Sequence, residues 1–167
     1  MDASSVVIDF AGFLKKVDEI HNTQQSRCLV ETFLSGKEYS VGILEDRSTG
    51  DLTAMPIEII ADKNKNGHRI LDFDIKRNDH EKVVAVTDMR VHKQISDLAK
   101  VAFKALSGKS FGRIDVKMNH NRVPHFIEAN LMPGLRKGYF YRACLLNLNM
   151  SYEQMILKIA NSGLSYK

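Results

Sequence analysis

Residues 111–135, FGRIDVKMNHNRVPHFIEANLMPGL, predict a β-hairpin that ends in a Pro-Gly corner. Apolar or β-branched residues alternate with polar residues over 111–118 and again over 123–130, which is the period of a strand. The residues between these runs, 119–122, have the composition of a turn. The sequence therefore predicts two neighbouring antiparallel strands, around which the other elements are arranged.

Several polar residues of this hairpin share one predicted face. With a loop of residues 119–122, Asp115 lies opposite Phe126, and Arg113 lies opposite Glu128. Residues two apart on a strand point to the same face, which gathers the polar set Arg113, Asp115, Glu128 and Asn130. Asp115 and Glu128 are then diagonal neighbours, roughly 7–8 Å apart between Cα atoms. A loop one residue shorter or longer would reverse the parity and divide the set between the two faces.

The polar face of the hairpin offers the ligands of a divalent-metal site. Two carboxylates and an amide oxygen are hard ligands, which suit Mg²⁺ or Mn²⁺ better than zinc. An arginine beside such an ion can stabilise the charge of a transferring phosphoryl group. The alternative is an exposed face with an ordinary cross-strand pair of Arg113 and Glu128. The common face, followed by the Pro-Gly turn, favours the metal site.

The composition predicts one soluble globular domain. The chain has 167 residues, 44% hydrophobic and 26% charged, which is enough for a sizeable core. It contains no apolar run near the ~20 residues of a membrane span, and its first ten residues lack the pattern of a signal peptide. Cys28 and Cys144 have neither disulfide-framework nor metal-ligand spacing, so a cytoplasmic location is expected.

The formal net charge of +4 at pH 7 admits nucleic-acid or anionic-ligand binding without requiring either. The basic residues are dispersed, and aromatic and basic residues do not interleave as they do in RNA-binding proteins. A small basic nucleic-acid-binding domain is therefore the least favoured function.

The N-terminal half predicts a helix and then strands. Asp9 is expected to cap a helix from residue 10 to about residue 20. Strands are predicted at 27–34, 38–45 and 52–60, and the first two are expected to form a hairpin. Pro56 cannot donate to a ladder, so the third strand is expected at an edge or a bulge. Residues 61–81 are polar and are expected to form a long, mobile loop over a ligand.

The C-terminal half predicts helices around the hairpin. A short strand at 82–86 precedes a helix over 89–106, which Gly108 is expected to end as a C-cap glycine. Another helix is predicted at 139–147. Ser151 and Gln154 have the spacing of a capping box for a last helix through Asn161, closed by Gly163. This order of elements indicates an α+β fold, a mostly antiparallel sheet with helices packed on it.

Two segments resemble the D-alanine–D-alanine ligase branch of the ATP-grasp ligases: GRIDVKMNHNRVPHFIEANLMPGL at 112–135 and LVETFLSGKEYSVGIL at 29–44. The resemblance implies the C-terminal ATP-binding portion of an ATP-dependent carboxylate–amine ligase that works through an acyl phosphate. It implies one domain over 1–167, in which 1–26 are a remnant of the preceding ATP subdomain and 27–167 form the C-terminal subdomain.

The resemblance also implies how ATP is bound. The adenine edge would be formed by a run of four residues, Glu31, Thr32, Phe33 and Leu34, and Glu38 matches the carboxylate that binds the ribose hydroxyls. Lys76 falls where such ligases have a lysine on a mobile loop over the phosphates. Charged strand positions, core packing and a solvated lysine are the ordinary alternatives for these residues.

At the reaction centre, the resemblance gives the hairpin residues individual roles. Arg113 matches the arginine that steadies the acyl-phosphate step, and Gly134 matches a turn glycine whose N–H faces the developing oxyanion. The ligands of Mg²⁺ or Mn²⁺ would be Asp115, Glu128 and Asn130.

The sequence departs from the family after Gly134, where 135–140 read LRKGYF in place of small hydroxyl residues that hold the acceptor's carboxylate. This departure argues against D-alanine as the acceptor amine. The N-terminal domains of a full ligase are expected to be missing, so the isolated chain should bind Mg·ATP weakly and show no turnover. Two further possibilities are kept: that the protein forms a homodimer, and that it is a non-catalytic module that binds a nucleotide or a partner.

Overall fold

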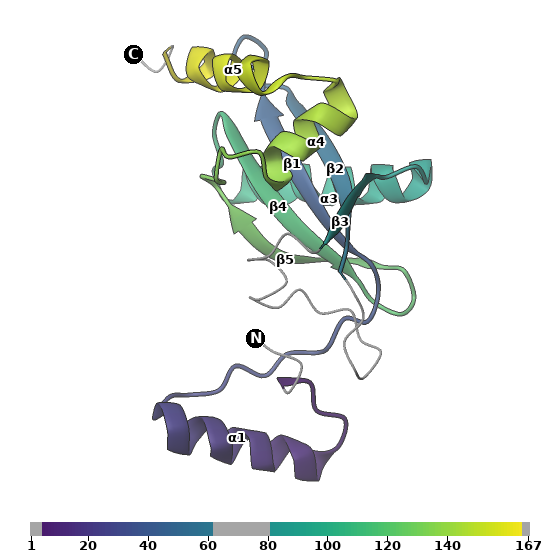
Figure 1. Ribbon diagram of the computed structural model, residues 1–167, viewed down its shortest axis with the longest axis vertical. Coiled ribbons are helices and arrows are strands. Elements are labelled where there is room, and N and C mark those ends of the chain that lie inside the picture. The colour runs from purple at the N-terminus through teal and green to yellow at the C-terminus, as the bar shows by residue number, and fades with distance from the viewer. Residues whose placement is uncertain (1–4, 62–80, 165–167) are drawn as a thin grey trace. The chain divides into compact units, whose positions relative to one another are not determined.

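A computed structural model of the protein describes residues 5–61 and 81–164 (Figure 1). The chain divides into two compact units: residues 36–60 with 82–167, here the sheet unit, and residues 1–35 with 61–81, here the N-terminal unit. Residues 62–80 of the predicted loop, including Lys76, lie outside the described residues. Within the described ranges, no helix has the length and apolar character that crossing a bilayer requires.

The described part of the sheet unit contains one antiparallel sheet with the strand order β3-β2-β1-β4-β5. Its strands are β1 (Glu38–Glu45), β2 (Leu52–Ile60), β3 (Lys82–Ala85), β4 (Phe111–Met118) and β5 (Pro124–Asn130). These bounds agree closely with the predicted strands, so the expected antiparallel sheet is confirmed. The turn after β1 is closed by Gly50, whose φ of 75° is left-handed and whose N–H donates to the Asp46 carbonyl.

Residues 27–34 are not a strand, and the predicted hairpin between them and 38–45 is wrong. The segment has no regular secondary structure, and Leu29 is 83% exposed. The reason lies in the sheet: β1 pairs with β2 along one edge and with β4 along the other. No edge of β1 is left for a third strand.

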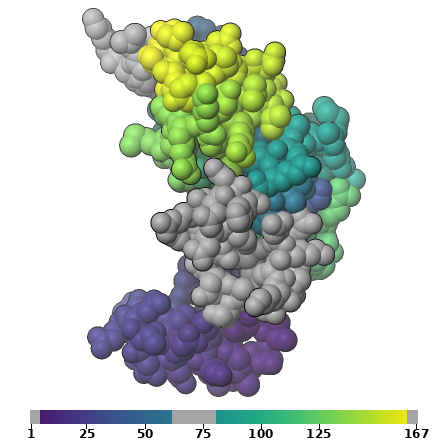
Figure 2. Space-filling view, in the orientation of Figure 1, coloured from purple at the N-terminus to yellow at the C-terminus, as the bar shows by residue number. Residues whose placement is uncertain are grey.

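Helices cover both faces of the sheet (Figure 1). On one face, α3 (Met89–Ala105) buries a stripe of Val91, Ile95, Ala99 and Phe103. On the other face, α4 (Tyr139–Leu148) buries Phe140, Ala143 and Cys144, and α5 (Tyr152–Leu164) adds Met155. Burial raises the pKa of the Cys144 thiol to about 12, so this cysteine is a neutral core residue. Figure 2 shows α4 and α5, in yellow-green and yellow, beside each other at the surface.

The end of α3 differs from the prediction in the residue that takes the left-handed conformation. Ser107 has a φ of 56°, and the Gly108 N–H donates to the Phe103 carbonyl at 2.9 Å. This is a Schellman-type ending in which Gly108 lies one position beyond the left-handed residue. A Cβ on Gly108 would collide with the Phe103 ring. Glycine is required here by close packing rather than by a positive φ.

The start signals of two other helices are confirmed. The Asp9 carboxylate accepts from the Gly12 N–H at 2.7 Å and caps α1 (Phe10–Gln24), which runs one turn further than expected. At α5, the Ser151 N–H donates to Gln154 Oε1 at 2.8 Å and the Gln154 N–H donates to Ser151 Oγ at 3.2 Å, which is a capping box. The helix continues to Leu164, so Gly163 does not close it.

β2, which contains Pro56, is an interior strand rather than an edge strand, but Pro56 itself has no partner on β3. β3 pairs only with residues 57–60 of β2, whereas Pro56 pairs with Val41 on the other side. The Pro56 carbonyl accepts from Asn147 Nδ2 at 3.1 Å. The missing N–H is therefore tolerated, because that side of β2 faces a side chain of α4 rather than a strand.

Candidate functional site

The hairpin of β4 and β5 brings the predicted metal-binding residues together, in a register that differs from the predicted one. Asp115 lies directly opposite Glu128, and Arg113 lies directly opposite Asn130. The predicted partners, Phe126 for Asp115 and Glu128 for Arg113, are therefore wrong. Direct cross-strand partners share a face and lie closer than diagonal neighbours, so the shared polar face itself is confirmed.

Two departures from the predicted hairpin cancel each other. The connection between the strands is 119–123, one residue longer than expected. Alone, this length would move Glu128 to the opposite face from Asp115. The register shifts between Asp115 and Val116 of β4, where a bulge leaves Ile127 of β5 without a direct partner on β4. This extra residue returns Glu128 to the same face as Asp115. Arg122, with a φ of 60°, closes the turn, and its guanidinium donates to the Asp88 carboxylate at 3.0 Å.

Asp115 is held by a donor on its own strand, Arg113, and by a donor on the neighbouring strand β1, Ser40. The Arg113 guanidinium binds it in a bidentate manner, with Nε 2.9 Å from Oδ1 and Nη2 2.8 Å from Oδ2. Ser40, its cross-strand partner on β1, donates from Oγ to Oδ1 at 2.7 Å and is itself 1% exposed. The side chain of Asp115 is 14% exposed, so its carboxylate has a fixed orientation at the edge of the core.

Glu128 lies at the solvent-exposed side of this group, and its side chain is 54% exposed. Its Oε1 accepts from Asn130 Nδ2 at 3.3 Å and lies 3.8 Å from Arg113 Nη2. The same guanidinium nitrogen therefore faces both carboxylates. The Arg113 guanidinium also lies over the Tyr139 ring, 5.7 Å from its centroid, at the start of α4.

Glu38 lies on the same face, one pair further along the sheet. It pairs with Lys117 of β4, whose Nζ is 3.1 Å from Glu38 Oε2. Residues 38 and 40 of β1 and residues 113, 115 and 117 of β4 therefore form a continuous polar row across these two neighbouring strands. This row borders the apolar cluster of α4 at Gly42, where an added Cβ would approach Ala143 Cβ to 3.2 Å.

The ligand set fits a hard divalent cation. Asp115 and Glu128 are adjacent carboxylates, and the amide of Asn130 follows on the same strand face. Within the described ranges, no group of three or more His, Cys, Asp and Glu side chains could hold a metal, so an ion here would rely on the amide and on phosphate or water oxygens. In the structure, the positive charge between the carboxylates belongs to Arg113.

Gly134 lies on the loop that joins β5 to α4, and a Cβ added there would meet nothing within 4 Å. Its φ is not left-handed, so neither packing nor backbone conformation requires glycine at this position. After it, Lys137 Nζ lies over the Tyr152 ring of α5, 5.6 Å from its centroid. Lys137 thus belongs to the packing of α5, whereas Tyr139 contacts Arg113.

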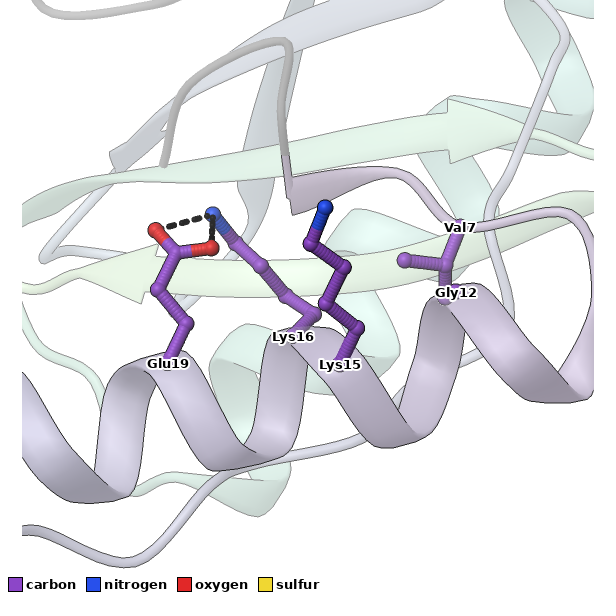
Figure 3. Close-up of a pocket in the computed structure, with 5 residues that line it drawn as sticks. All are labelled: Val7, Gly12, Lys15, Lys16 and Glu19. Carbon is purple, nitrogen blue, oxygen red and sulfur yellow. Dashed lines mark hydrogen bonds and ion pairs between the residues drawn. The ribbon is translucent and has the colours of Figure 1, made fainter.

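The predicted adenine residues, Glu31, Thr32, Phe33 and Leu34, belong to the N-terminal unit. That unit also contains a hollow along α1, shown in Figure 3 and lined by Val7, Gly12, Lys15, Lys16 and Glu19. Lys16 pairs with Glu19 at 3.1 Å, one turn along the helix. No residue of α1 is buried, and its apolar residues Phe10 and Leu14 are 72% and 48% exposed.

The sequence matches the model of one protein family, described as the D-ala D-ala ligase C-terminus, over residues 8–161. The chain therefore belongs to this family, and the resemblance seen in the two sequence segments is confirmed.

Curated relatives are named D-alanine–D-alanine ligase. The chain is 25% identical over 141 residues to a D-alanine–D-alanine ligase of Clostridium beijerinckii, covering 83% of this chain and 44% of the relative. It is 27% identical over 146 residues to a D-alanine–D-alanine ligase of Streptococcus pyogenes, covering 86% of this chain and 40% of the relative. The chain thus spans less than half the length of these relatives.

Solved structures support the fold. The D-alanine–D-alanine ligase of Bacillus anthracis complexed with ATP superposes with a TM-score of 0.68 at 16% identity, covering 95% of this chain and 48% of that chain. The VanG D-Ala:D-Ser ligase of Enterococcus faecalis gives a TM-score of 0.58 at 22% identity, over 78% of this chain and 37% of that chain. These likenesses confirm the predicted ATP-grasp fold.

Proposed function

We propose that this chain is the ATP-binding and metal-binding portion of an ATP-dependent carboxylate–amine ligase that works through an acyl phosphate. The observation that carries the proposal is the direct pairing of Asp115 with Glu128 beside Arg113 and Asn130. Family membership supports the reaction class, and the names of the relatives suggest D-alanine as the substrate pair. The proposal does not specify the acceptor amine, because residues 135–140 are basic and aromatic rather than small hydroxyl residues.

In this proposal the side chains of the polar row have separate tasks. Asp115, Glu128 and Asn130 hold Mg²⁺ or Mn²⁺, which would supply positive charge to the phosphate oxygens of ATP. Arg113 neutralises charge on the phosphoryl group during transfer. Glu38 of β1, on the same face, accepts from the ribose hydroxyls, and this requires Lys117 to release it or share it. The Gly134 N–H would face the developing oxyanion.

The proposal keeps the remaining predicted roles. Glu31, Thr32, Phe33 and Leu34 would contact adenine, Lys76 would reach the phosphates, and residues 27–167 would act as the C-terminal subdomain. Small carboxylate and amine substrates and a cytoplasmic location belong to the same proposal. The free thiols of Cys28 and Cys144 are consistent with a reducing compartment.

Ligand-induced stabilisation tests the nucleotide site, because a ligand that binds only the folded state raises the melting temperature of the protein. The melting temperature of the full chain is measured with Mg²⁺ alone, and with ATP or adenosine in the presence and absence of Mg²⁺. We expect stabilisation by ATP that requires Mg²⁺, and a smaller effect of adenosine. Stabilisation by adenosine and ATP to the same extent, with or without Mg²⁺, would contradict the metal-dependent phosphate site.

A further inference from the structure

Arg113 occupies both oxygens of the carboxylate that the proposed function assigns to a metal ion. Its Nε and Nη2 lie 2.9 Å and 2.8 Å from Asp115 Oδ1 and Oδ2. The same Nη2 is 3.8 Å from Glu128 Oε1. A single guanidinium therefore binds one carboxylate of the pair and lies within ion-pair distance of the other, and the negative charge of both would otherwise attract a divalent cation.

This guanidinium is a strong competitor. A bidentate arginine–carboxylate pair is among the strongest hydrogen-bonded contacts in proteins, and arginine keeps its charge at every accessible pH. The side chains of Arg113 and Asp115 are 19% and 14% exposed, so solvent screens this pair less than an exposed one. Ser40 also donates to Oδ1, so this oxygen accepts from both Ser40 and Arg113 Nε, whereas Oδ2 accepts from Arg113 Nη2.

We propose that Arg113 and the divalent cation compete for Asp115, so that the cation binds fully only when the guanidinium has left the carboxylate. This inference rests on the proposed metal site. Tyr139 offers the guanidinium a second contact, because its ring centroid is 5.7 Å from Arg113 Cζ. An anionic phosphoryl group would give the guanidinium an alternative partner. Phosphate and metal therefore bind with positive coupling, because each favours the state in which Arg113 is released.

Mn²⁺ affinity of the full chain without nucleotide tests the competition, measured by isothermal titration calorimetry. Both Arg113→Gln and Arg113→Lys should tighten Mn²⁺ binding, Arg113→Gln by about tenfold or more, because one strong charge-assisted contact is removed. Arg113→Lys keeps the positive charge but loses the fork, so tightening in this variant separates competition from simple charge repulsion. Equal affinity in the wild type and Arg113→Lys would overturn the proposal.

Two further variants complete the test. Lys117→Met removes another cation from the same face without releasing Asp115, and we expect it to change Mn²⁺ affinity much less than Arg113→Gln does. An equally large effect of Lys117→Met would overturn the proposal in favour of net charge. Asp115→Asn should abolish Mn²⁺ binding. If it does not, or if the wild type and both Arg113 variants bind no Mn²⁺, the proposed metal site itself fails.

The position of the guanidinium provides a readout that does not depend on affinity. The Arg113 Nε–H signal, assigned by its loss in Arg113→Gln, should shift in a ¹⁵N-resolved NMR titration with Mg²⁺ as the hydrogen bond to Asp115 breaks. A metal site that saturates through Asp115 while this signal stays unchanged would overturn the competition and leave the proposed function intact.

Discussion

Asp115 of β4 and Glu128 of β5 are direct cross-strand partners, and the two carboxylates face the same side of the sheet as α4. Two like charges directly opposite each other are destabilising unless a cation lies between them. In the structure, Arg113 provides that positive charge. The pair therefore depends on a nearby positive charge, which under the proposed function a bound divalent ion would supply in place of Arg113.

The first prediction concerns the two carboxylates as metal ligands. Asp115→Asn and Glu128→Gln should each weaken Mg²⁺-dependent ATP binding by at least about tenfold, because each removes a charged ligand, while the fold stays intact. Calorimetric titration with Mg·ATP measures the affinity, and circular dichroism measures the fold. Glu58→Gln, which removes a carboxylate paired with Lys37 elsewhere on the sheet, is the matched control. Unchanged affinity in both site variants would refute the assignment.

The second prediction makes Ser40 a positioning residue for Asp115. Its hydroxyl is 2.7 Å from Oδ1 and buried, so Ser40→Ala leaves a carboxylate oxygen without its buried donor. We expect metal affinity to fall roughly threefold to tenfold, on the basis of ~0.5–1.5 kcal/mol for one net hydrogen bond. Ser40→Thr keeps the hydroxyl and should restore the affinity. If Thr and Ala weaken metal binding equally, the hydroxyl has no positioning role.

The third prediction compares two glycines of the same sheet unit. A Cβ on Gly112 would lie 2.6 Å from Phe103 Cε2 in the α3 core, so Gly112→Ala should lower the free energy of unfolding by about 1–3 kcal/mol. Gly134 has open space around it, and Gly134→Ala should change stability by less than about 0.5 kcal/mol. Urea unfolding measures both. Equal losses would show that the loop at Gly134 is packed.

The fourth prediction concerns pH. The N–H of Val91, followed by the Arg122 side chain, holds the pKa of Asp88 below its ordinary value of 3.8. A carboxylate with a lowered folded-state pKa stabilises the fold above its unfolded pKa, and this contribution is lost as pH falls through the folded value. Asp88→Asn still caps α3 but cannot ionise, so its melting temperature should fall less than that of the wild type from about pH 5 to about pH 3.

Asp97→Asn is the control for this pH dependence, because it removes an exposed carboxylate of the same helix from its pair with Lys93. Identical acid profiles for the wild type and Asp88→Asn would mean that the Asp88 charge does not stabilise the start of α3.

The strands and helices of the sheet unit were largely predictable, because their apolar periodicity matches the faces that α3 and α4 cover. The hairpin register was not, since it depends on a longer turn and a compensating bulge. The adjacent apolar pair Phe126–Ile127 interrupts the alternation of β5 and is the one sequence signal of that bulge.

Sequence reasoning also missed Ser40, Lys117 and Tyr139, each of which contacts a predicted site residue. Ser40 lies two residues after Glu38 in a predicted strand, so period-two geometry placed both on one face. Which strand lies beside them depends on pairing between distant segments, and the prediction gave β1 the wrong neighbour at 27–34. The contact of Tyr139 with Arg113 depends on how α4 packs on the sheet, which the sequence pattern does not specify.

Under the proposed function, Asp115 and Glu128 hold the divalent ion of a bound nucleotide. A crystal structure of the chain with Mn²⁺ and a non-hydrolysable ATP analogue can decide this, because anomalous scattering locates the metal without reference to a model. We expect an anomalous peak between the carboxylates of Asp115 and Glu128, with the Arg113 guanidinium withdrawn from Asp115. A bound nucleotide whose Mn²⁺ lies elsewhere, with the pair of Arg113 and Asp115 intact, would rule out this metal site.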